Sequence, residues 1–327
     1  MSSTIDVSAG IIVKGNKILA ARRKAGLHLA GFWEFPGGKV ESNESPENCL
    51  VRELKEEFGI DTRVTDYVGD NYHAYSDKTI HLIAFRVEHL SGEIQLIDHD
   101  EIKWLAIDEL DSLKWAEADI PLVQAFKASI SLTEFYQKQA ISYAKETASF
   151  DMGDLYSRFL NHLPNHAHIL DLGCGSGRDS SYFLDQGYLV TALDGSAELA
   201  GIAEKLIKQP VVVSLYQNMV FEDIFDGVWA CASLLHCPKS QMSSVLLNIY
   251  QALKDDGVLY ASFKRGENES SDERGRFFNN YTSKHLITLI ESIGGFEVLA
   301  CWEEDKPLRD STQSWVNLIT RKVGAVT

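Results

Sequence analysis

The sequence is poor in the features that would link it to nucleic acid or to a membrane. Its 327 residues contain 31 Lys and Arg against 47 Asp and Glu, which gives a formal net charge of −16. Such a chain lacks the basic surface that a phosphate backbone requires, so stable nucleic-acid binding is not expected. No run of 18 apolar residues is present, which argues against a membrane-spanning helix. The first residues also lack the charged start and apolar centre of a signal peptide.

Cysteine is sparse, and its spacing is uninformative for metals. The five cysteines, at positions 49, 174, 231, 237 and 301, form no C-x-x-C pair. Reduced thiols in a cytoplasmic protein are therefore expected. The acidic excess is shared by both parts of the chain, with 14 Lys and Arg against 22 Asp and Glu in residues 1–128 and 17 against 25 in the remainder. The expected partners are nucleotides and other small molecules, and the sequence specifies no oligomeric state.

The length predicts two domains. A chain of 327 residues is long enough for two separate cores. We expect one domain over residues 1–130 and a second over residues 131–327 that starts with a helical linker. Residues 128–150 contain neither proline nor glycine, so they are expected to be helical, with the second core beginning near Tyr136.

The segment "GGKVESNESPENCLVRELKEEFGI" predicts a helix with one acidic face. Ser45 before Pro46 is a typical N-cap, and Gly59 is a typical C-terminal stop. The expected helix, Pro46–Phe58, carries apolar residues on one side and charged residues on the other. The apolar set is Leu50, Val51, Leu54 and Phe58, and the charged set is Arg52, Glu53, Glu56 and Glu57. Carboxylates three and four residues apart repel one another, and a solvated charged face is the ordinary interpretation of such a cluster.

The spacing of the same residues favours a catalytic interpretation. Five residues separate Gly38 from Glu44, seven separate Glu44 from Arg52, and the sequence R-E-L-x-E-E-x-G-I follows. This segment resembles the box of the Nudix hydrolases at every fixed position. The resemblance implies that the catalytic residues Glu53, Glu56 and Glu57 hold Mg²⁺ or Mn²⁺ against a nucleoside-diphosphate-linked substrate, while Arg52 orients them. Carboxylate oxygens are the ligands that these hard cations prefer. Glu101 is a candidate general base, with an exposed loop glutamate as the alternative.

The flanking residues narrow the substrate class. The segment "AGIIVKGNKILAARRKAGLHLAGFWEFPGGKVE" resembles Nudix proteins of the MutT and CTP-pyrophosphohydrolase types. Strands at residues 11–13 and 18–21 would bring Arg22 and Arg23 to the mouth of the site, where they could bind substrate. The cytidine-type relatives carry aspartate in a context like that of Asp119 in "ADIP", whereas those that read 8-oxoguanine carry asparagine. A carboxylate can accept a hydrogen bond from the exocyclic amino group of cytosine. We therefore expect (d)CTP or a modified pyrimidine triphosphate. An oxidised purine nucleotide is one alternative, and a helix cap before Pro121 is another role for Asp119.

A second nucleotide-binding pattern follows in "HILDLGCGSGRD". An apolar strand at residues 169–172 runs into a turn with three glycines, and a helix is expected from about Asp179. This unit lets a backbone approach a nucleotide-like ligand closely, and Asp194 ends the next strand, where it can bind ribose hydroxyls. These features resemble class I S-adenosylmethionine (SAM)-dependent methyltransferases over about residues 136–327. The resemblance implies cofactor contacts from Asp171, Gly173, Gly175, Gly177, Asp194 and Met219, although Met219 is equally consistent with core packing.

The later segments follow the order of that fold. Strands are expected at "PVVVSLYQNM", "DGVWACASLLHC" and "GVLYASF", then a helix at residues 283–293 and an antiparallel pair at "FEVLACWEE" and "SWVNLITRK". The fourth strand is followed by Cys-Ala-Ser-Leu in place of the Asn/Asp-Pro-Pro-aromatic motif, which argues against amino methylation of DNA. His236 is either a base for the methyl acceptor or a structural histidine. The segment "FKRGENESSDERGRFFNNYT" is expected to be a mobile polar loop with Arg274, Arg276 and Tyr281 as acceptor contacts.

Taken together, these patterns predict an α/β protein with two catalytic domains. The first is expected to be a Nudix α/β/α sandwich with a mixed sheet, and the second a Rossmann-like class I methyltransferase. The expected function is bifunctional, with Mg²⁺-dependent hydrolysis of a nucleoside triphosphate to monophosphate and pyrophosphate, and methyl transfer from SAM to a small molecule. The alternative is an 8-oxo-dGTP-type sanitiser of the nucleotide pool whose second domain is a SAM-binding regulatory module.

Overall fold

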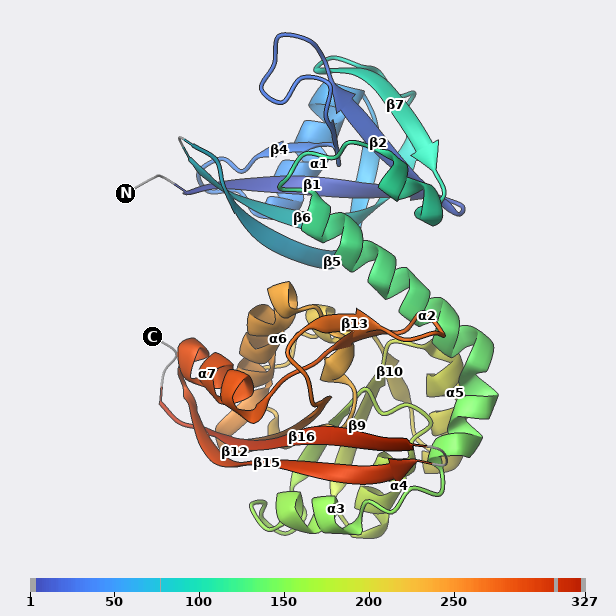
Figure 1. Cartoon of the computed structure of the whole chain (residues 1–327), viewed down its shortest axis with the longest axis vertical. Coiled ribbons are helices and arrows are strands. Elements are labelled where there is room, and N and C mark those ends of the chain that lie inside the picture. The colour runs from blue at the N-terminus through green and yellow to red at the C-terminus, as the bar shows by residue number, and fades with distance from the viewer. Residues whose placement is uncertain (1–3, 77, 309–310, 325–327) are drawn as a thin grey trace. The chain divides into compact units, whose positions relative to one another are not determined.

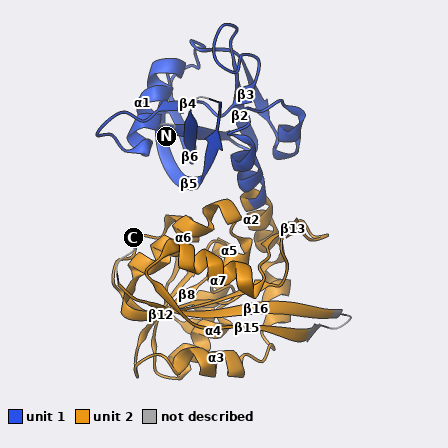
Figure 2. Ribbon diagram, turned by 60° about the vertical axis from the view of Figure 1, so that its left-hand side comes forward, with its two compact units in different colours: residues 1–128 blue, residues 129–327 orange. Residues whose placement is uncertain are grey.

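A computed structural model describes residues 4–76, 78–308 and 311–324 of the chain. It contains two compact units, Met1–Ala128 and Ser129–Thr327 (Figures 1 and 2). Helix α2, Ile120–Thr147, contributes its first residues to unit 1 and the remainder to unit 2. The helix is uninterrupted because no glycine or proline occurs between Pro121 and Gly153, so the residues expected to be a linker are part of one regular element.

Unit 1 is built on a mixed sheet. The main strand order is β3-β2-β1-β6-β5, with β4 paired to β1 and β7 paired to β2. Strands β1 and β6 are parallel, whereas the other pairs are antiparallel. The strands are β1 Thr4–Lys14, β2 Lys17–Arg23, β3 Trp33–Glu34, β4 Gly37–Lys39, β5 Asp61–Ala74, β6 Thr79–Ser91 and β7 His99–Leu105, and a 3₁₀ turn, η1, covers Ile107–Ser112.

Helix α1, Pro46–Phe58, has the predicted bounds and the predicted caps. Ser45 Oγ accepts a hydrogen bond from the backbone N–H of Asn48, and Gly59 ends the helix in the left-handed conformation. The helix packs its apolar side on the sheet, and the side chains of Cys49, Leu50, Leu54 and Phe58 are buried. The prediction that Val51 belongs to the apolar side was wrong, because its side chain is 39% exposed. It lies at the edge of the apolar stripe, and Cys49 takes the buried position instead.

Unit 2 contains a seven-stranded sheet in the order β10-β9-β8-β11-β12-β16-β15. The first five strands are parallel, and β16 and β15 are antiparallel at the edge, as predicted. Chain order and spatial order reverse at β8, so the ends of β8 and β11 face the crevice where open α/β sheets bind ligands. The strands are β8 His168–Leu172, β9 Leu189–Asp194, β10 Val211–Val213, β11 Phe225–Ala230, β12 Leu253–Lys264, β15 Phe296–Leu308 and β16 Ser311–Lys322.

Helices cover both faces of this sheet. Helices α3 and α4 pack aromatic residues against one face, around Trp229 and Tyr260, and α5 packs on the same side over β9 and β10. Helices α6 and α7 cover the other face with an aliphatic core. Their bounds are α3 Gly153–Leu160, α4 Arg178–Asp185, α5 Ala197–Ile207, α6 Lys239–Ala252 and α7 Ser283–Ile293, with 3₁₀ turns η2 at Tyr216–Asn218 and η3 at Leu234–His236.

The segment expected to be a mobile polar loop is partly ordered as a hairpin. Strands β13, Glu269–Ser271, and β14, Phe277–Asn279, pair antiparallel. Phe278 and Asn279 of this hairpin are buried. Burial of the Phe278 ring anchors a segment that is otherwise polar. Tyr281, expected to contact the acceptor, is also buried and packs against Phe263. The other two residues expected to contact the acceptor, Arg274 and Arg276, line a cavity.

Candidate functional sites

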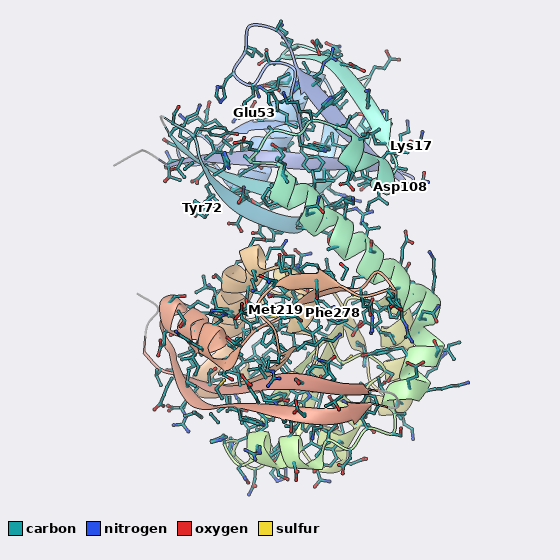
Figure 3. All side chains as sticks on the ribbon, in the orientation of Figure 1. Lys17, Glu53, Tyr72, Asp108, Met219 and Phe278 are labelled. Atoms are coloured by element: carbon teal, nitrogen blue, oxygen red, sulfur yellow. The ribbon has the colours of Figure 1, made fainter. Side chains whose placement is uncertain are left out.

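The charged face of α1 is organised by Arg52. Its Nη1 lies 2.8 Å from Glu53 Oε1 and 3.2 Å from Glu56 Oε2, and its Nη2 lies 2.6 Å from Glu44 Oε1. These carboxylates raise the pKa of Arg52, and Arg52 lowers the pKa of Glu44. One guanidinium therefore holds three of the acidic side chains that the sequence identified. The side chain of Glu53 is only 15% exposed, whereas that of Glu56 is 61% exposed. Figure 3 labels Glu53 among the side chains of unit 1.

The half-buried carboxyl of Glu57 completes the acidic cluster. Its pKa is raised to about 7, chiefly by burial; the charge of His99 opposes the shift, and the carboxylates of Asp98, Glu53 and Glu34 add to it. Crowding of carboxylates at a partly desolvated position is unfavourable unless a cation neutralises them. Glu34 and Asp98 were not identified from the sequence. Glu34 could have been, because it stands in "WEFPGG" directly before the box.

Arg23 and His99 lie around Glu34 at this site. Arg23 Nη1 donates to both carboxylate oxygens of Glu34, at 2.8 and 3.0 Å. His99 Nε2 lies 2.9 Å from Glu34 Oε1. The other ring nitrogen, His99 Nδ1, is buried and has no hydrogen-bond partner in the described part of the chain. A buried polar atom of this kind ordinarily contacts a water or a ligand.

Arg22 and Glu101 are brought together, but not at this cluster. Their Cα atoms are partners across β2 and β7, and Arg22 Nη1 lies 2.7 Å from Glu101 Oε2. Arg22 also donates to Asp100, and its guanidinium lies over the ring of Trp33. Successive residues of a strand point to opposite faces, so Arg22 and Arg23 leave β2 on different sides. Only Arg23 therefore lies next to Glu34.

Asp119 is buried, with 4% of its surface exposed. Its Oδ1 accepts a hydrogen bond of 2.9 Å from the backbone N–H of Phe35, which follows Glu34. Burial and the nearby charge of Glu34 raise the pKa of Asp119 well above its ordinary value. The side chain thus points across the domain to Phe35, while its backbone carbonyl begins α2 by accepting from Val123. Tyr75, whose hydroxyl lies near Asp119, was not predicted from the sequence to belong to this site.

In unit 2 the glycine turn is fixed by the ends of two strands. Gly173 and Cys174 donate their backbone N–H groups to Leu193 O, at 2.8 and 2.9 Å. Gly173, Gly175 and Gly177 all have positive φ. A Cβ on Gly173 would lie 2.4 Å from Ser233 Cβ, so no larger residue fits there. The turn therefore brings bare backbone to the edge of the cavity described below.

Two aspartates flank this turn. Asp194 accepts hydrogen bonds from the backbone N–H groups of Gly175, at 2.7 Å, and Ser196, at 2.8 Å. Asp171 is buried and accepts from Ser180 Oγ at 2.5 Å, and burial together with the charge of Asp179 raises its pKa. Asp194 thus braces the backbone of the turn directly, whereas Asp171 links the end of β8 to Ser180 of α4.

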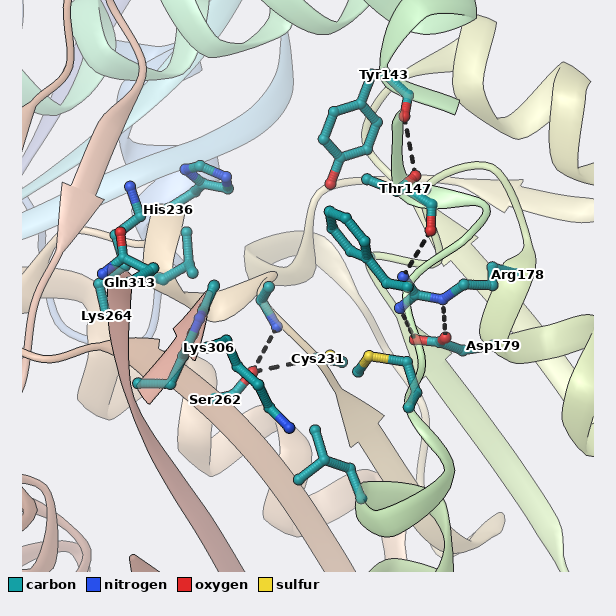
Figure 4. Close-up of a pocket in the computed structure, with 18 of the residues that line it drawn as sticks. Tyr143, Thr147, Arg178, Asp179, Cys231, His236, Ser262, Lys264, Lys306 and Gln313 are labelled. Atoms are coloured by element: carbon teal, nitrogen blue, oxygen red, sulfur yellow. Dashed lines mark hydrogen bonds and ion pairs between the residues drawn. The ribbon is translucent and has the colours of Figure 1, made fainter. Parts of the chain in front are cut away.

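A cavity of about 640 Å³ extends from the glycine turn to the β13–β14 hairpin. This volume is within the range of small-molecule sites. Gly173, Gly175 and His236 line it, together with Tyr136 and Tyr143 from α2. Figure 4 labels His236 and Tyr143 in the lining. Met219 does not line it. Its side chain is buried in the core shared with α6 and α7, which favours the packing alternative for this residue.

His236 uses both ring nitrogens in contacts within the protein. Nδ1 lies 2.7 Å from the backbone oxygen of Phe277, and Nε2 lies 3.0 Å from the hydroxyl of Tyr136. A carbonyl only accepts, so the proton resides on Nδ1 and the Tyr136 hydroxyl donates to Nε2. Burial lowers the pKa of His236 to about 4. The imidazole is therefore neutral and structurally engaged at physiological pH.

Two features are absent from the residues that the structure describes. These residues contain no group of three or more His, Cys, Asp or Glu side chains already arranged to hold a metal. The chemistry of the α1 cluster nevertheless fits a divalent cation, because it gathers several carboxylates at a partly buried position. None of the helices in the described ranges has the length and apolar character needed to cross a membrane.

Comparison with known proteins matches each unit to a family. Residues 4–126 match the model of the NUDIX domain, and residues 170–261 match that of a methyltransferase domain. The chain is 44% identical over 124 residues to the CTP pyrophosphohydrolase of Escherichia coli (strain K12). These matched residues cover 38% of this chain and 92% of that protein. The chain is also 32% identical over 124 residues to the 8-oxo-dGTP diphosphatase of the same organism, which covers 38% and 96%.

A solved structure matches unit 2 in fold. It is the Burkholderia thailandensis 1,6-didemethyltoxoflavin-N1-methyltransferase, with a TM-score of 0.52, 22% identity, and coverage of 61% of this chain and 90% of that one. The folds and matches define an enzyme with a NUDIX hydrolase domain followed by a methyltransferase domain that has the Rossmann-like class I fold. The chain belongs to the NUDIX family.

Proposed function

We propose that the first domain hydrolyses a cytidine-type nucleoside triphosphate to the monophosphate and pyrophosphate. The observation that carries this proposal is the buried Asp119 carboxyl, held by the Phe35 N–H. The relative with 44% identity, named as a CTP pyrophosphohydrolase, supports the same class.

The raised pKa of Asp119 supports a particular mode of base recognition. Its raised pKa favours the neutral acid, which offers one O–H donor and a carbonyl acceptor. Cytosine presents N3 as an acceptor and N4–H₂ as a donor on its pairing edge. The two groups are therefore complementary, and a bidentate pair of this kind is worth about 1–3 kcal/mol of discrimination.

The cluster on α1 would hold Mg²⁺ or Mn²⁺ through Glu53, Glu56 and Glu57. Such an ion supplies charge neutralisation at the bridging phosphates and a bound water of lowered pKa. Arg52 orients Glu53 and Glu56 through the ion pairs described above. Arg23, held by Glu34 beside Glu57, is placed to bind phosphate oxygens.

The proton acceptor for the attacking water is assigned to the acidic cluster. Asp98 lies close enough to Glu57 to raise its pKa. Glu101, the candidate from the sequence, is paired with Arg22 on the other face of the strand and could act only after that ion pair opened. The contacts thus favour Asp98 over Glu101.

The experiment is pyrophosphate release with Mg²⁺ across canonical, methylated and oxidised nucleoside triphosphates. A preference of at least 10-fold in kcat/KM for cytidine-type nucleotides is expected. A preference for 8-oxo-dGTP would replace this proposal with nucleotide-pool sanitation, which the relative named 8-oxo-dGTP diphosphatase favours as second candidate.

We propose further that the second domain binds SAM at the glycine turn and transfers its methyl group to a small molecule. The backbone of Gly173 and Gly175 lines the cavity, and a Cβ on Gly175 would meet only Tyr143, at 3.8 Å. This open cradle fits an adenosyl group, with Asp194 offering its remaining lone pairs to ribose hydroxyls. Asp171 and Gly177 support the turn from behind it. When bound, the cofactor supplies an electrophilic methyl group.

The competing possibility is a regulatory domain that binds SAM without turnover. Calorimetry of SAM binding, combined with S-adenosylhomocysteine formation in the presence of a small-molecule extract, separates the two. Binding with turnover is expected, and binding without turnover would support the regulatory alternative.

A further inference from the structure

The wall of the cavity at the β13–β14 hairpin carries two cations stacked on one ring. Lys264 Nζ lies 3.3 Å from the ring centroid of Phe278, and the Arg276 guanidinium carbon lies 5.2 Å from it. Lys264 ends β12 and Phe278 belongs to β14, so tertiary structure alone brings them together. Figure 4 shows Lys264 and His236 on one side of the cavity, with Arg178 and Asp179 on the other.

Of these two cations, only Arg276 forms an ion pair with a carboxylate among the described residues, that of Asp272. Arg276 Nη2 lies 2.7 Å from Asp272 Oδ2, and Arg276 Nε lies 2.9 Å from the same oxygen. In the described part of the chain no carboxylate forms an ion pair with Lys264, which is half-buried. Burial and the neighbouring Arg276 lower the pKa of Lys264, the response expected of a cation without a partner. This corner of a strongly acidic protein therefore has an excess of positive charge.

The other carboxylates at the cavity do not relieve that excess. Asp179 is bonded to Arg178 Nε at 2.6 Å and to Trp229 Nε1 at 2.8 Å. Glu304 lies 3.3 Å from Lys306 Nζ. The two remaining carboxylates, Glu146 and Asp151, are exposed to solvent.

The hairpin wall is also held in place. The Tyr136 hydroxyl, fixed by His236, lies near Arg276, and the Arg276 guanidinium carbon lies 5.0 Å from the ring centroid of Phe135. A guanidinium anchored by a carboxylate and by rings is preorganised to receive an oxyanion through its remaining N–H groups. The apolar side chains of Leu235 and Trp315 line the same cavity and can receive the body of a small molecule.

We infer that the methyl acceptor carries an anionic group, a carboxylate or a phosphate, bound by Lys264 and Arg276 above Phe278. This inference rests on the proposed methyl transfer. The anion restores the local charge balance, and the cavity holds the acceptor with that group at the hairpin wall and its nucleophile toward the glycine turn. In the reaction the nucleophile's electron pair forms the bond to the methyl carbon. The carbon–sulfur bond breaks onto sulfur, and the acceptor's proton leaves to solvent.

The test separates a small-molecule extract on an anion-exchange column at neutral pH and assays each fraction with the full-length enzyme for S-adenosylhomocysteine. Acceptor activity is expected in the retained fraction. Activity confined to the flow-through would overturn the inference while leaving methyl transfer intact. No turnover with any fraction, despite SAM binding, would overturn the methyl transfer itself. Phosphatase treatment of the active fraction abolishes a phosphate-bearing acceptor, whereas carbodiimide amidation abolishes a carboxylate-bearing one.

A variant series assigns the anion site to the hairpin wall. Lys264→Met is expected to raise KM for the active fraction at least 10-fold while the Kd for SAM changes less than 2-fold. Lys264→Arg, which keeps the charge, is expected to recover most of the loss. Lys254→Met is the matched control, because Lys254 lies on the same strand, pairs with Asp226 and is not part of the cavity wall. An unchanged KM in Lys264→Met would remove Lys264 from the acceptor site.

Discussion

The carboxylate of Glu53 packs directly against the α-carbon of Gly38. A Cβ at position 38 would lie 2.1 Å from Glu53 Cδ, well inside van der Waals contact. The glycine of the box is thus required by a specific neighbour. Because Gly38 has no side chain, there is space for the Glu53 carboxylate, whose side chain is only 15% exposed.

Replacing Gly38 with alanine is therefore expected to displace Glu53. A misplacement of about 1 Å in a catalytic site costs on the order of 100-fold in rate, so we expect a loss of this size in pyrophosphate release. Steady-state kinetics with Mg²⁺ check this. Gly201→Ala is the matched control, because a Cβ there meets nothing within 4 Å and φ is not positive. Equal activities of the two variants would disprove the positioning role.

Glu56→Gln is expected to remove most metal-dependent hydrolysis. The substitution removes a charged ligand, and the loss should exceed the roughly 10- to 100-fold that outer-shell partners cost. Pyrophosphate release and SAM calorimetry are measured on the same preparation, and the SAM affinity should not change. Glu47→Gln, on the exposed first turn of α1, is the control. Full activity in Glu56→Gln would exclude a role in metal binding.

Asp119→Ala is expected to change nucleotide preference. The methyl group offers neither the O–H donor nor the carbonyl acceptor of the neutral acid. In Asp119→Ala we expect kcat/KM for cytidine-type triphosphates to fall by about 10- to 100-fold, corresponding to about 1–3 kcal/mol, with a smaller change for purines. Asp119→Asn, whose amide keeps one N–H donor and one carbonyl acceptor, should retain most of the preference. The nucleotide panel measures this. Glu117→Gln, at an exposed neighbour that pairs with His73, should keep the wild-type preference. A uniform loss across all nucleotides would instead indicate a structural role.

Asp194→Ala is expected to weaken SAM binding by roughly 1.5–3 kcal/mol, the range for hydrogen bonds to a charged group. The substitution also leaves the Gly175 and Ser196 N–H groups without their acceptor, so some loss of thermal stability should accompany it. Asp194→Asn separates the two effects, since its single carbonyl oxygen can hold only part of this network. Calorimetry with SAM gives the result, and unchanged affinity in both variants would exclude Asp194 from the cofactor site.

The buried His236 predicts an acid-sensitive second domain. Its pKa is about 4 in the folded chain, against an ordinary 6.5. Between these values the unfolded chain binds a proton that the folded chain does not. The stabilisation is therefore complete above pH 6.5, decreases as the pH falls and is lost below pH 4, with a total of roughly 3 kcal/mol.

Urea unfolding of wild type and His236→Gln at pH 7.5, 6 and 5 measures this contribution. The stability difference between the two proteins should shrink as the pH falls. Histidine NMR titration provides an independent reading, in which one of the ten histidines should show no inflection above pH 5. Ten ordinary titrations near pH 6.5 would contradict the prediction.

Much of the local structure was predictable because local interactions determine it. Helix α1 has the expected bounds since its cap and stop are encoded at Ser45, Pro46 and Gly59. The succession of strands and helices in unit 2 and its antiparallel edge pair were implied by the resemblance to class I methyltransferases, and both are present in the structure. The spacing of the box and of the glycine turn identified both enzyme classes before any contact was known.

The side-chain partners were not predictable, because they depend on register and packing between distant segments. The pairing of β2 with β7 brings Arg22 next to Glu101, whereas Arg23 forms its ion pair with Glu34. The polar segment that contains β13 and β14 forms a hairpin because the Phe278 side chain packs in the core of unit 2. The sequence by itself determined the family of each domain, through the types and spacing of residues along one helix and one turn. Only the tertiary structure decided which charges meet across strands, since a side chain's neighbours are set by folding over long separations.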